Sequence, residues 1–207
     1  MKVFKFGGAS VKDAESVKNV ASIIKNEGSK NTLIIISAMG KMTNAFEDVV
    51  DAYYNKSDEL PNKLNFIEEY HKSIIDSLFD KDDDIYKKVD VLLGELGWFL
   101  ARNTSKRYNY VYDQIICFGE LLSTRIVSAY ITKIGLENTW FDVRNFIKTD
   151  SNYRDAKVDW KLTQDLISEK VDTNKINITQ GFIAANDTEN TTTLGREGSD
   201  YTAAIFA

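Results

Sequence analysis

The first 36 residues alternate between apolar and amphipathic segments, and this order restricts the possible folds more than any other feature of the chain. Residues 3–6 are apolar except for Lys5, and residues 32–36 form a continuous, largely apolar run, as expected for a strand in the middle of a parallel sheet. Between them, residues 13–26 carry apolar side chains at helical spacing, and residues 27–29 are expected to close this helix. Strand, helix and strand together make an α/β unit, so the sequence predicts an α/β fold with parallel strands.

The rest of the chain continues with helical and strand patterns and contains no internal repeat. Helices are expected at residues 43–103, where two amphipathic faces occur, and at 111–134 and 161–170. A strand is expected at residues 139–143, a strand followed by a turn at 175–184, and a polar turn at 186–193.

The composition indicates a globular protein. With 207 residues, of which 43% are hydrophobic and 12% aromatic, the chain can bury a core, and we expect a single domain over residues 1–207. The one cysteine, Cys117, excludes a disulfide within the chain, and its apolar neighbours predict a buried thiol in a reducing compartment. No apolar run approaches the roughly 20 residues that span a bilayer, and the first residues follow a strand pattern rather than that of a signal peptide. We therefore predict a cytoplasmic protein without a membrane partner.

Charged residues are plentiful, but the basic ones form no dense cluster. The 26 basic and 31 acidic residues give a net charge of −5, and no basic cluster is dense enough to follow a nucleic-acid backbone, so nucleic acid is not an expected partner. The one histidine, His71, falls on what we interpret as the polar flank of a helix, and no Cys/His grouping has metal-ligand spacing. The acidic connector at residues 80–84, four aspartates with Lys81 between them, lacks the spacing of a calcium loop and is interpreted as a solvated turn. We predict no metal site and no histidine-based triad.

Lys5 is out of place for ordinary core packing, because it lies inside the first apolar strand. Gly7 and Gly8 follow at once. Two glycines allow backbone N–H groups to approach a ligand and to reach φ values that a Cβ forbids, and a following helix points its positive end at the same place. This combination suits a phosphate group. The alternative is a tight turn with the lysine extending to water, and the chain contains neither a Walker A loop nor a Gly-x-Gly-x-x-Gly motif.

Small and hydroxyl side chains follow the second strand at residues 37–44. In open parallel sheets, ligands bind beyond the carboxyl ends of the strands, where this loop and the loop after the first strand must both lie. Both loops are therefore expected at one ligand site.

Two charged residues further along the chain are candidate ligand contacts. Glu120 has apolar neighbours in the long expected helix, so part of its side chain should face a dry environment and need a cationic or hydrogen-bonding partner; ordinary surface exposure is the alternative. Arg196 lies between two glycines, and its planar fork suits bidentate binding of a carboxylate or phosphate. The Gly-Ser-Asp that follows starts a helix, and it also suits an ordinary helix cap.

Four segments, in their order and spacing, resemble the signature segments of aspartate kinases. They are KFGGAS at residues 5–10, SAMG followed by TN at 37–44, FGEL at 118–121 and GREGSDYTAA at 195–204. Residues 141–144 and 149–150 are also similar to that family. The resemblance extends over the whole chain and implies the amino-acid kinase fold, with a mainly parallel central sheet between helical layers.

The resemblance implies transfer of the γ-phosphoryl group of Mg-ATP to the β-carboxylate of L-aspartate, a step in lysine, threonine and methionine biosynthesis. ATP and Mg²⁺ are thus the implied cofactors, L-aspartate the implied substrate, and a homo-oligomer the implied state of the full-length enzyme. A reaction of this kind needs positioning and positive charge more than a covalent nucleophile.

The resemblance also implies roles for individual residues. As catalytic residues, Lys5 would neutralise charge on the phosphoryl group and Asp200 would hold Lys5 and the reacting groups in line. The nucleotide side would consist of Lys5, Phe6, Gly7, Gly8 and Ser37. The aspartate side would consist of Thr43, Glu120 near the ammonium, Arg196 on a carboxylate, and Ser199.

The chain departs from the family pattern in two respects. Ala9 stands where threonine is usual, and Glu197 stands where glycine or asparagine is frequent, but neither change removes a charged catalytic group. The chain also stops at Ala207, whereas these enzymes continue through the rest of the nucleotide site and through regulatory ACT domains. We therefore expect the N-terminal, aspartate-binding part of a kinase domain, C-terminally truncated, with very low activity by itself.

Three other interpretations remain beside this one. The chain could be another kinase of the same fold, such as a glutamate, acetylglutamate or uridylate kinase, although the Gly-Arg-x-Gly-Ser-Asp-Tyr ending favours aspartate. It could be a non-catalytic amino-acid-binding module, but the presence of both Lys5 and Asp200 argues against this. It could also be a piece of a longer enzyme, including one fused to homoserine dehydrogenase.

Overall fold

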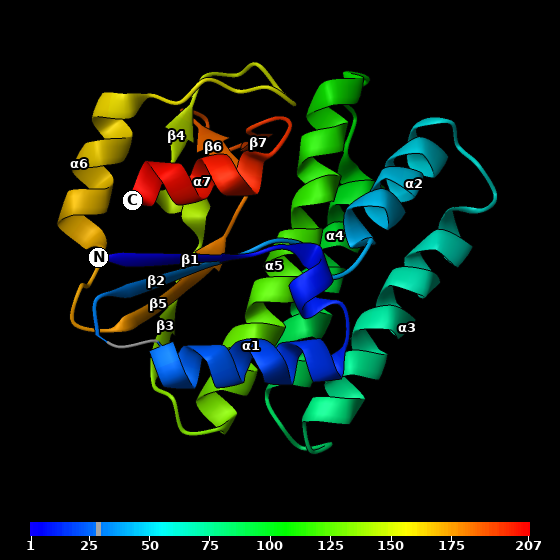
Figure 1. Ribbon diagram of the computed structural model, residues 1–207. Coiled ribbons are helices and arrows are strands. Elements are labelled where there is room, and N and C mark those ends of the chain that lie inside the picture. Colours follow the sequence, from blue (N-terminus) through cyan, green and yellow to red (C-terminus); the bar gives the residue numbers. More distant parts are fainter. Residues whose placement is uncertain (28–29) are drawn as a thin grey trace.

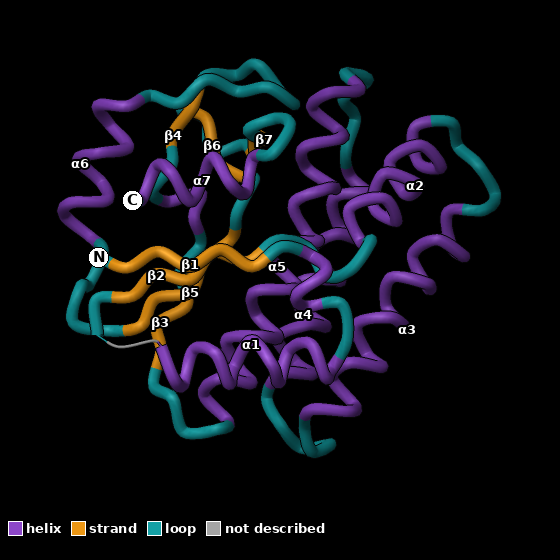
Figure 2. The backbone as a smooth tube through the Cα atoms, viewed as in Figure 1, coloured by secondary structure: helices purple, strands orange, loops and turns teal. Residues whose placement is uncertain are grey.

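The computed structural model describes residues 1–27 and 30–207, and its centre is a four-stranded parallel sheet (Figures 1 and 2). The strands lie side by side in the order β1 (Lys2–Phe6), β2 (Thr32–Ile36), β5 (Ile176–Gln180) and β3 (Asn138–Trp140). Phe6 is opposite Ile36, which is opposite Gln180, so three strands end together at one edge. The predicted α/β fold with parallel strands is confirmed.

The burial of the strands follows their position in the sheet. All five residues of β2 are buried, as its continuous apolar run predicts. β1 lies at one edge of the sheet, and Val3, Phe4 and Phe6 are only half-buried, although the sequence predicted a buried strand. The difference arises because a strand with one paired neighbour is covered less completely than a central strand.

Helices cover both faces of the sheet (Figure 1). α1 (Ala14–Glu27) and α5 (Tyr108–Lys133) lie on one face, and α7 (Gly198–Phe206) packs against β1 and β2 on the other. The predicted first helix is confirmed, but residues 28 and 29 of its expected closing turn lie outside the described residues. A short 3-10 helix, η1 (Gly8–Val11), begins at the second glycine of the pair, and α1 begins only after it.

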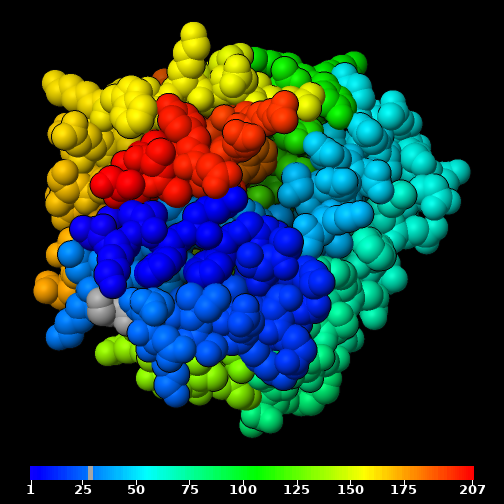
Figure 3. Space-filling model, in the orientation of Figure 1, coloured from blue at the N-terminus to red at the C-terminus, as the bar shows by residue number. Residues whose placement is uncertain are grey.

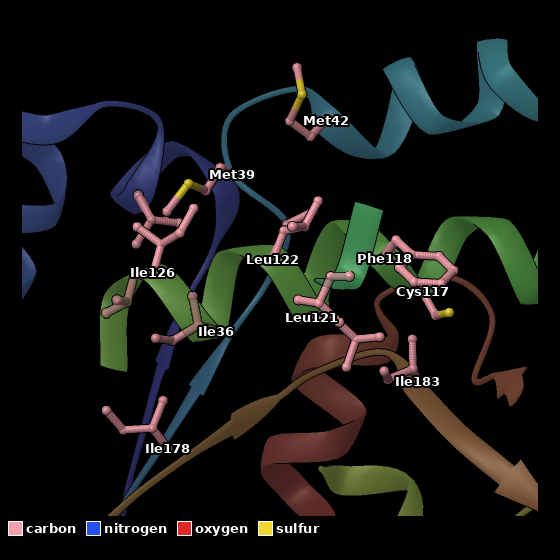
Figure 4. Close-up of a cluster of buried hydrophobic side chains, with 14 of the residues drawn as sticks. Ile36, Met39, Met42, Cys117, Phe118, Leu121, Leu122, Ile126, Ile178 and Ile183 are labelled. Carbon is pink, nitrogen blue, oxygen red and sulfur yellow. The ribbon is translucent and has the colours of Figure 1, made fainter. Parts of the chain in front are cut away.

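The core is built around α5, whose apolar side chains point to several elements at once. Figure 4 shows Leu121, Leu122 and Ile126 of this helix among residues of the neighbouring strands and loops. Cys117 is buried there, as predicted, and burial raises the pKa of its thiol to about 12. By length and composition α5 would be able to cross a membrane, but 78% of its apolar window is buried inside the protein, which is typical of a core helix.

The long helical region predicted at residues 43–103 forms three helices beside α5: α2 (Met42–Tyr54), α3 (Leu60–Leu78) and α4 (Ile85–Arg102). The interpretation of His71 as a residue on a polar flank is wrong. His71 is fully buried in α3, where Nδ1 lies 2.7 Å from the carbonyl oxygen of Ile67, and burial lowers its pKa to about 4.

A second, smaller sheet lies beside α7 and contains strands that the sequence did not predict (Figure 2). Its order is β4 (Lys148–Thr149), β6 (Ile183–Asn186) and β7 (Thr191–Thr193). The polar turn expected at 186–193 therefore ends in a strand, whose three threonines are all buried. The strand expected at 139–143 ends at Trp140, and the short helix η2 (Val143–Asn145) follows it. The helix predicted at residues 161–170 is confirmed as α6 (Trp160–Lys170).

Candidate active site

A cavity of about 380 Å³ lies at the edge where the parallel strands end. In Figure 3 the face around it is formed by the N-terminal segment in blue, the C-terminal segment in red and the α2 segment in cyan. Segments far apart in the sequence thus meet at one hollow. The lining consists of Lys5, Ser37, Thr43, Tyr112, Glu120, Arg154, Phe182, Thr193 and residues 195–200.

Most of the residues predicted for the site line this cavity together. They are Lys5, Ser37, Thr43, Glu120, Arg196, Ser199 and Asp200. The other three, Phe6, Gly7 and Gly8, are not among the lining residues. A Cβ on Gly7 would lie 3.5 Å from Lys5 Nζ, so the glycine pair adjoins the cavity without enclosing it.

The glycine pair serves close packing rather than an unusual backbone conformation. Gly7 has φ −76°, and neither Gly7 nor Gly8 has a positive φ, which corrects the expected reason for two glycines. A Cβ on Gly8 would lie 2.6 Å from the carbonyl oxygen of Gly40 and 2.7 Å from that of Ala38. The backbone N–H of Gly40 also donates to the carbonyl oxygen of Gly8 over 2.9 Å. The two loops that follow β1 and β2 are therefore locked against each other.

Lys5 and Asp200 form an ion pair across the cavity. Lys5 Nζ lies 3.1 Å from each of the two carboxylate oxygens of Asp200, which belongs to the first turn of α7. The Lys5 side chain is 27% exposed and that of Asp200 is 61% exposed, so the pair is open to solvent and to a ligand. A pair this exposed adds little to stability, about 0–1 kcal/mol.

Glu120 brings a buried carboxyl group to the cavity. The residue is 2% exposed, as the apolar sequence around it predicted. Its Oε1 accepts a 3.3 Å hydrogen bond from the backbone N–H of Ala38, whereas Oε2 is buried and has no partner among the described residues. Burial raises the pKa of this carboxyl to about 8. An unpaired buried carboxylate oxygen is costly unless a ligand supplies a donor or a positive charge.

Hydroxyl groups join the loop after β2 to the start of α7. Ser37 Oγ donates to Ser199 Oγ over 3.0 Å, and Ser123 Oγ of α5 donates to the carbonyl oxygen of Ser37 over 2.7 Å. A Cβ on Gly181 would lie 2.5 Å from Ser199 Oγ, so only glycine at 181 lets α7 approach this closely. Ser37 and Ser199 are thus held in place on one side of the cavity.

Several lining residues were not predicted from the sequence. Tyr112, Arg154, Phe182 and Thr193 belong to none of the motifs to which a role was assigned. Asp113 was also missed, although it is fully buried beneath the cavity wall and accepts hydrogen bonds from Thr193 and from the backbone of Arg154. A charged residue inside an apolar helix is a signal that could have indicated Asp113; no comparable signal marks the others.

The family profile described as the amino acid kinase family matches residues 1–207. The chain belongs to the amino acid kinase family. Lysine-sensitive aspartokinase 3 of Escherichia coli strain K12 is 29% identical over 99% of this amino acid kinase chain, which covers 45% of the relative. A bifunctional aspartokinase/homoserine dehydrogenase 2, chloroplastic, of Arabidopsis thaliana is 31% identical over 99% of the chain, which covers 23% of that relative.

Solved structures give the same result for the fold. E. coli aspartokinase III in complex with lysine and aspartate matches this amino acid kinase with a TM-score of 0.89 at 29% identity, over 100% of the chain and 46% of the other protein. The structure of the same enzyme with aspartate and ADP matches equally well. The predicted amino-acid kinase fold and the predicted similarity to aspartokinases are confirmed, and the chain spans less than half the length of these relatives.

Proposed function

We propose that this chain is the aspartate-binding part of an aspartate kinase, which transfers the γ-phosphoryl group of ATP to the β-carboxylate of L-aspartate. The observation that carries the proposal is the unpartnered, buried oxygen of Glu120 in the same cavity as Arg196 and the Lys5–Asp200 pair. A carboxylate, a guanidinium and an ammonium held in one hollow match the charges of an amino acid with a second acidic group.

Glu120 binds the α-ammonium group of the substrate in this proposal. The ammonium supplies both a positive charge and a hydrogen-bond donor to Oε2, which lacks a partner among the described residues. The pair forms in a buried place, where electrostatic interactions are stronger than in water. Thr43 and Ser199 line the same cavity and offer hydroxyl groups to the rest of the substrate.

Arg196 binds a carboxylate of the substrate. Its five N–H donors lie in one plane and fit a carboxylate bidentately. Two features bring it to the cavity: Gly195, which has φ +75°, and the start of α7 at Gly198, two residues after Arg196. A positive φ of this size favours glycine, because other residues are strained there.

Lys5 and Asp200 act at the reacting carboxylate. Lys5 Nζ places positive charge where charge is spread over the transferring phosphoryl group, and Asp200 holds the ammonium of Lys5 in place. Phe6, Gly7, Gly8 and Ser37 form the nucleotide side in this proposal. No covalent nucleophile is needed, since phosphoryl transfer depends mainly on positioning and on neutralisation of charge.

ATP and Mg²⁺ are the proposed cofactors, and ADP is bound in one of the similar aspartokinase structures. No group of three or more His, Cys, Asp or Glu residues within the described chain is arranged to hold a metal ion. Mg²⁺ commonly takes its ligands from substrate phosphates and one or two carboxylates, so the ion would enter with the nucleotide and complete the neutralisation of its phosphate charge.

A non-catalytic amino-acid-binding module and another kinase of the same family are the competing proposals. The Lys5–Asp200 pair argues against the first, because binding of an amino acid does not require it. The second differs in the substrate, which a binding measurement tests directly.

Calorimetric titration of L-aspartate into the 207-residue chain tests the proposal, with L-glutamate as the competing ligand. We expect aspartate-selective binding that the Arg196→Ala variant weakens by about 10-fold or more, the scale of a lost charge-assisted hydrogen bond. Arg102→Ala is the control, because Arg102 is an arginine that lies outside the cavity. Binding of glutamate in preference to aspartate would show that the proposed substrate is wrong.

Three further expectations remain proposals. They are the single domain over residues 1–207, a homo-oligomer for the longer enzyme, and a cytoplasmic location. The buried thiol of Cys117 fits a reducing compartment, but the relatives include both bacterial and chloroplastic proteins. Fractionation of cells that express the full-length protein tests the location.

A further inference from the structure

Arg154 places a second guanidinium at the cavity, and none of the proposed roles uses it. The residue lies in the loop between β4 and α6 and lines the cavity with Arg196. Its guanidinium stacks on the ring of Tyr112, with the carbon Cζ 4.2 Å from the ring centroid. A guanidinium held by its face on an aromatic ring keeps the N–H donors at its edge free to bind an anion.

The backbone of Arg154 is held in an unfavourable conformation. Its φ is +73°, in the left-handed region that glycine and asparagine enter easily and other residues rarely. The backbone N–H donates to Asp113 Oδ2 over 3.0 Å. Strained backbone of this kind persists only where its surroundings impose it, and it is concentrated at functional sites. The strained backbone of Arg154 therefore favours a functional role for its side chain.

Asp113 joins the backbone of Arg154 to the segment that carries Arg196. Besides the N–H of Arg154, it accepts hydrogen bonds from the backbone N–H and the hydroxyl of Thr193, over 3.0 and 2.9 Å. A Cβ on Gly195 would lie 2.9 Å from Asp155 Oδ1 and 3.4 Å from the carbonyl oxygen of Arg154. The two segments are in direct contact, so they bring two arginines to one hollow.

The charges of the cavity leave two guanidinium groups for a ligand. Lys5 is paired with Asp200, whereas no salt bridge within the described residues involves Arg154 or Arg196. If L-aspartate is the substrate, as proposed above, the reacting β-carboxylate must lie near Lys5, and its ammonium near Glu120. Only the α-carboxylate then remains for the arginines. One carboxylate offers about four acceptor positions, enough for both.

We propose that Arg154 is a specificity-determining residue that binds the α-carboxylate of the substrate jointly with Arg196. The inference rests on the proposed function. It predicts that the site distinguishes a free α-carboxylate from a neutral group of the same shape, because a carboxamide replaces one acceptor oxygen with a donor that meets the arginine N–H groups.

The Arg154→Gly variant tests this role without a cost to folding. Glycine accepts φ +73° freely, so we expect the melting temperature to stay equal or to rise by about 1–4 °C. L-Aspartate should bind about 10-fold more weakly or worse. The unmodified chain should prefer L-aspartate over its α-carboxamide, measured as a competing ligand, and Arg154→Gly should lose much of that preference because the carboxamide affinity changes little. Arg154→Lys should restore part of the affinity for aspartate, since it keeps the charge and loses the fork.

The possible results separate this inference from the proposed function. If the unmodified chain binds L-aspartate and Arg154→Gly binds it equally well, the inference is overturned and the function stands. If Arg154→Gly weakens the binding of aspartate and of its α-carboxamide by the same factor, Arg154 does not recognise the α-carboxylate, and the inference is again overturned. If the unmodified chain does not bind L-aspartate, both are overturned. The Arg102→Ala variant, altered at an arginine stacked on Trp98, should bind aspartate like the unmodified chain.

Discussion

Two buried carboxylates on the same helix, Asp113 and Glu120 of α5, have opposite surroundings. Asp113 is fully buried and accepts three hydrogen bonds, two from Thr193 and one from the backbone of Arg154. Glu120 is 2% exposed and accepts one hydrogen bond, from the backbone of Ala38, while its second oxygen has no partner among the described residues. Burial raises the pKa of Asp113 to about 6 and that of Glu120 to about 8.

The difference separates a structural carboxylate, Asp113, from Glu120, the carboxylate that we propose binds the substrate. The hydrogen-bond donors around Asp113 offset much of the free-energy cost of burying its charge. They also fix the loop and the strand that carry the cavity wall. Glu120 lacks such donors, so the folded protein holds a group whose ionisation is unfavourable until a cation arrives. The two residues lie on one helix and differ in the number of hydrogen-bond donors that the folded protein places around each carboxylate.

Removal of the Asp113 carboxylate should have the largest effect on stability. Asp113→Ala leaves the buried N–H and hydroxyl of Thr193 and the part-buried N–H of Arg154 without their acceptor, and each such group costs about 1–3 kcal/mol. We expect the free energy of unfolding to fall by about 3–5 kcal/mol in denaturant titration. Thr193→Val, which removes only the hydroxyl, is the control and should cost about 1 kcal/mol. A loss below 1 kcal/mol in Asp113→Ala would contradict a structural role.

Neutralisation of Glu120 should change the stability in the opposite direction and raise the free energy of unfolding. The folded pKa of about 8 lies above the ordinary glutamate pKa of 4.5, so ionisation costs stability as the pH rises from 4.5 to 8. Glu120→Gln should therefore be more stable than the unmodified chain by about 1–3 kcal/mol at pH 8 and gain nothing below pH 4.5. Thermal melts at both pH values measure this, and L-aspartate binding should be lost. A destabilised variant at pH 8 would contradict this contrast with Asp113.

Binding of the substrate should release protons. Near pH 7 the Glu120 carboxyl is mostly protonated in the free protein, and an ammonium group beside it favours the ionised form. We expect up to about one proton released per L-aspartate bound, and an affinity that rises from pH 6 to pH 8. Titrations in two buffers of different ionisation enthalpy count the protons. Release that persists unchanged in Glu120→Gln would assign it to another group, such as Asp113.

The local sequence pattern was sufficient to predict the elements that are buried on all sides or along one regular face. The apolar run of β2 and the helical spacing of α1 indicated both elements, since burial on all sides or on one face leaves a periodic signal. The burial of Glu120 was predicted in the same way, from its apolar neighbours. β7 gave no such signal, because its buried side chains are threonines that a turn would also accept.

His71 illustrates a signal that was present and misinterpreted. It follows Ile67 by four residues and precedes Ile74 by three, which places it on the buried face of α3. The charged residues next to it in sequence favoured the opposite interpretation. Helical spacing, rather than the nearest neighbours in the chain, decides which side of a helix a residue occupies.

The sequence by itself determined the α/β layers, the buried core helix and most of the charged groups of the cavity, because these depend on periodicity and on short motifs. Only the tertiary structure decided which groups are paired and which are left for a ligand. Asp200 meets Lys5 from 195 residues away, a pairing that the family resemblance implied but no local pattern shows, and Arg154 reaches the cavity through a strained backbone that Asp113 holds. Such pairings depend on distances between segments that are remote along the chain, and no local pattern encodes those distances.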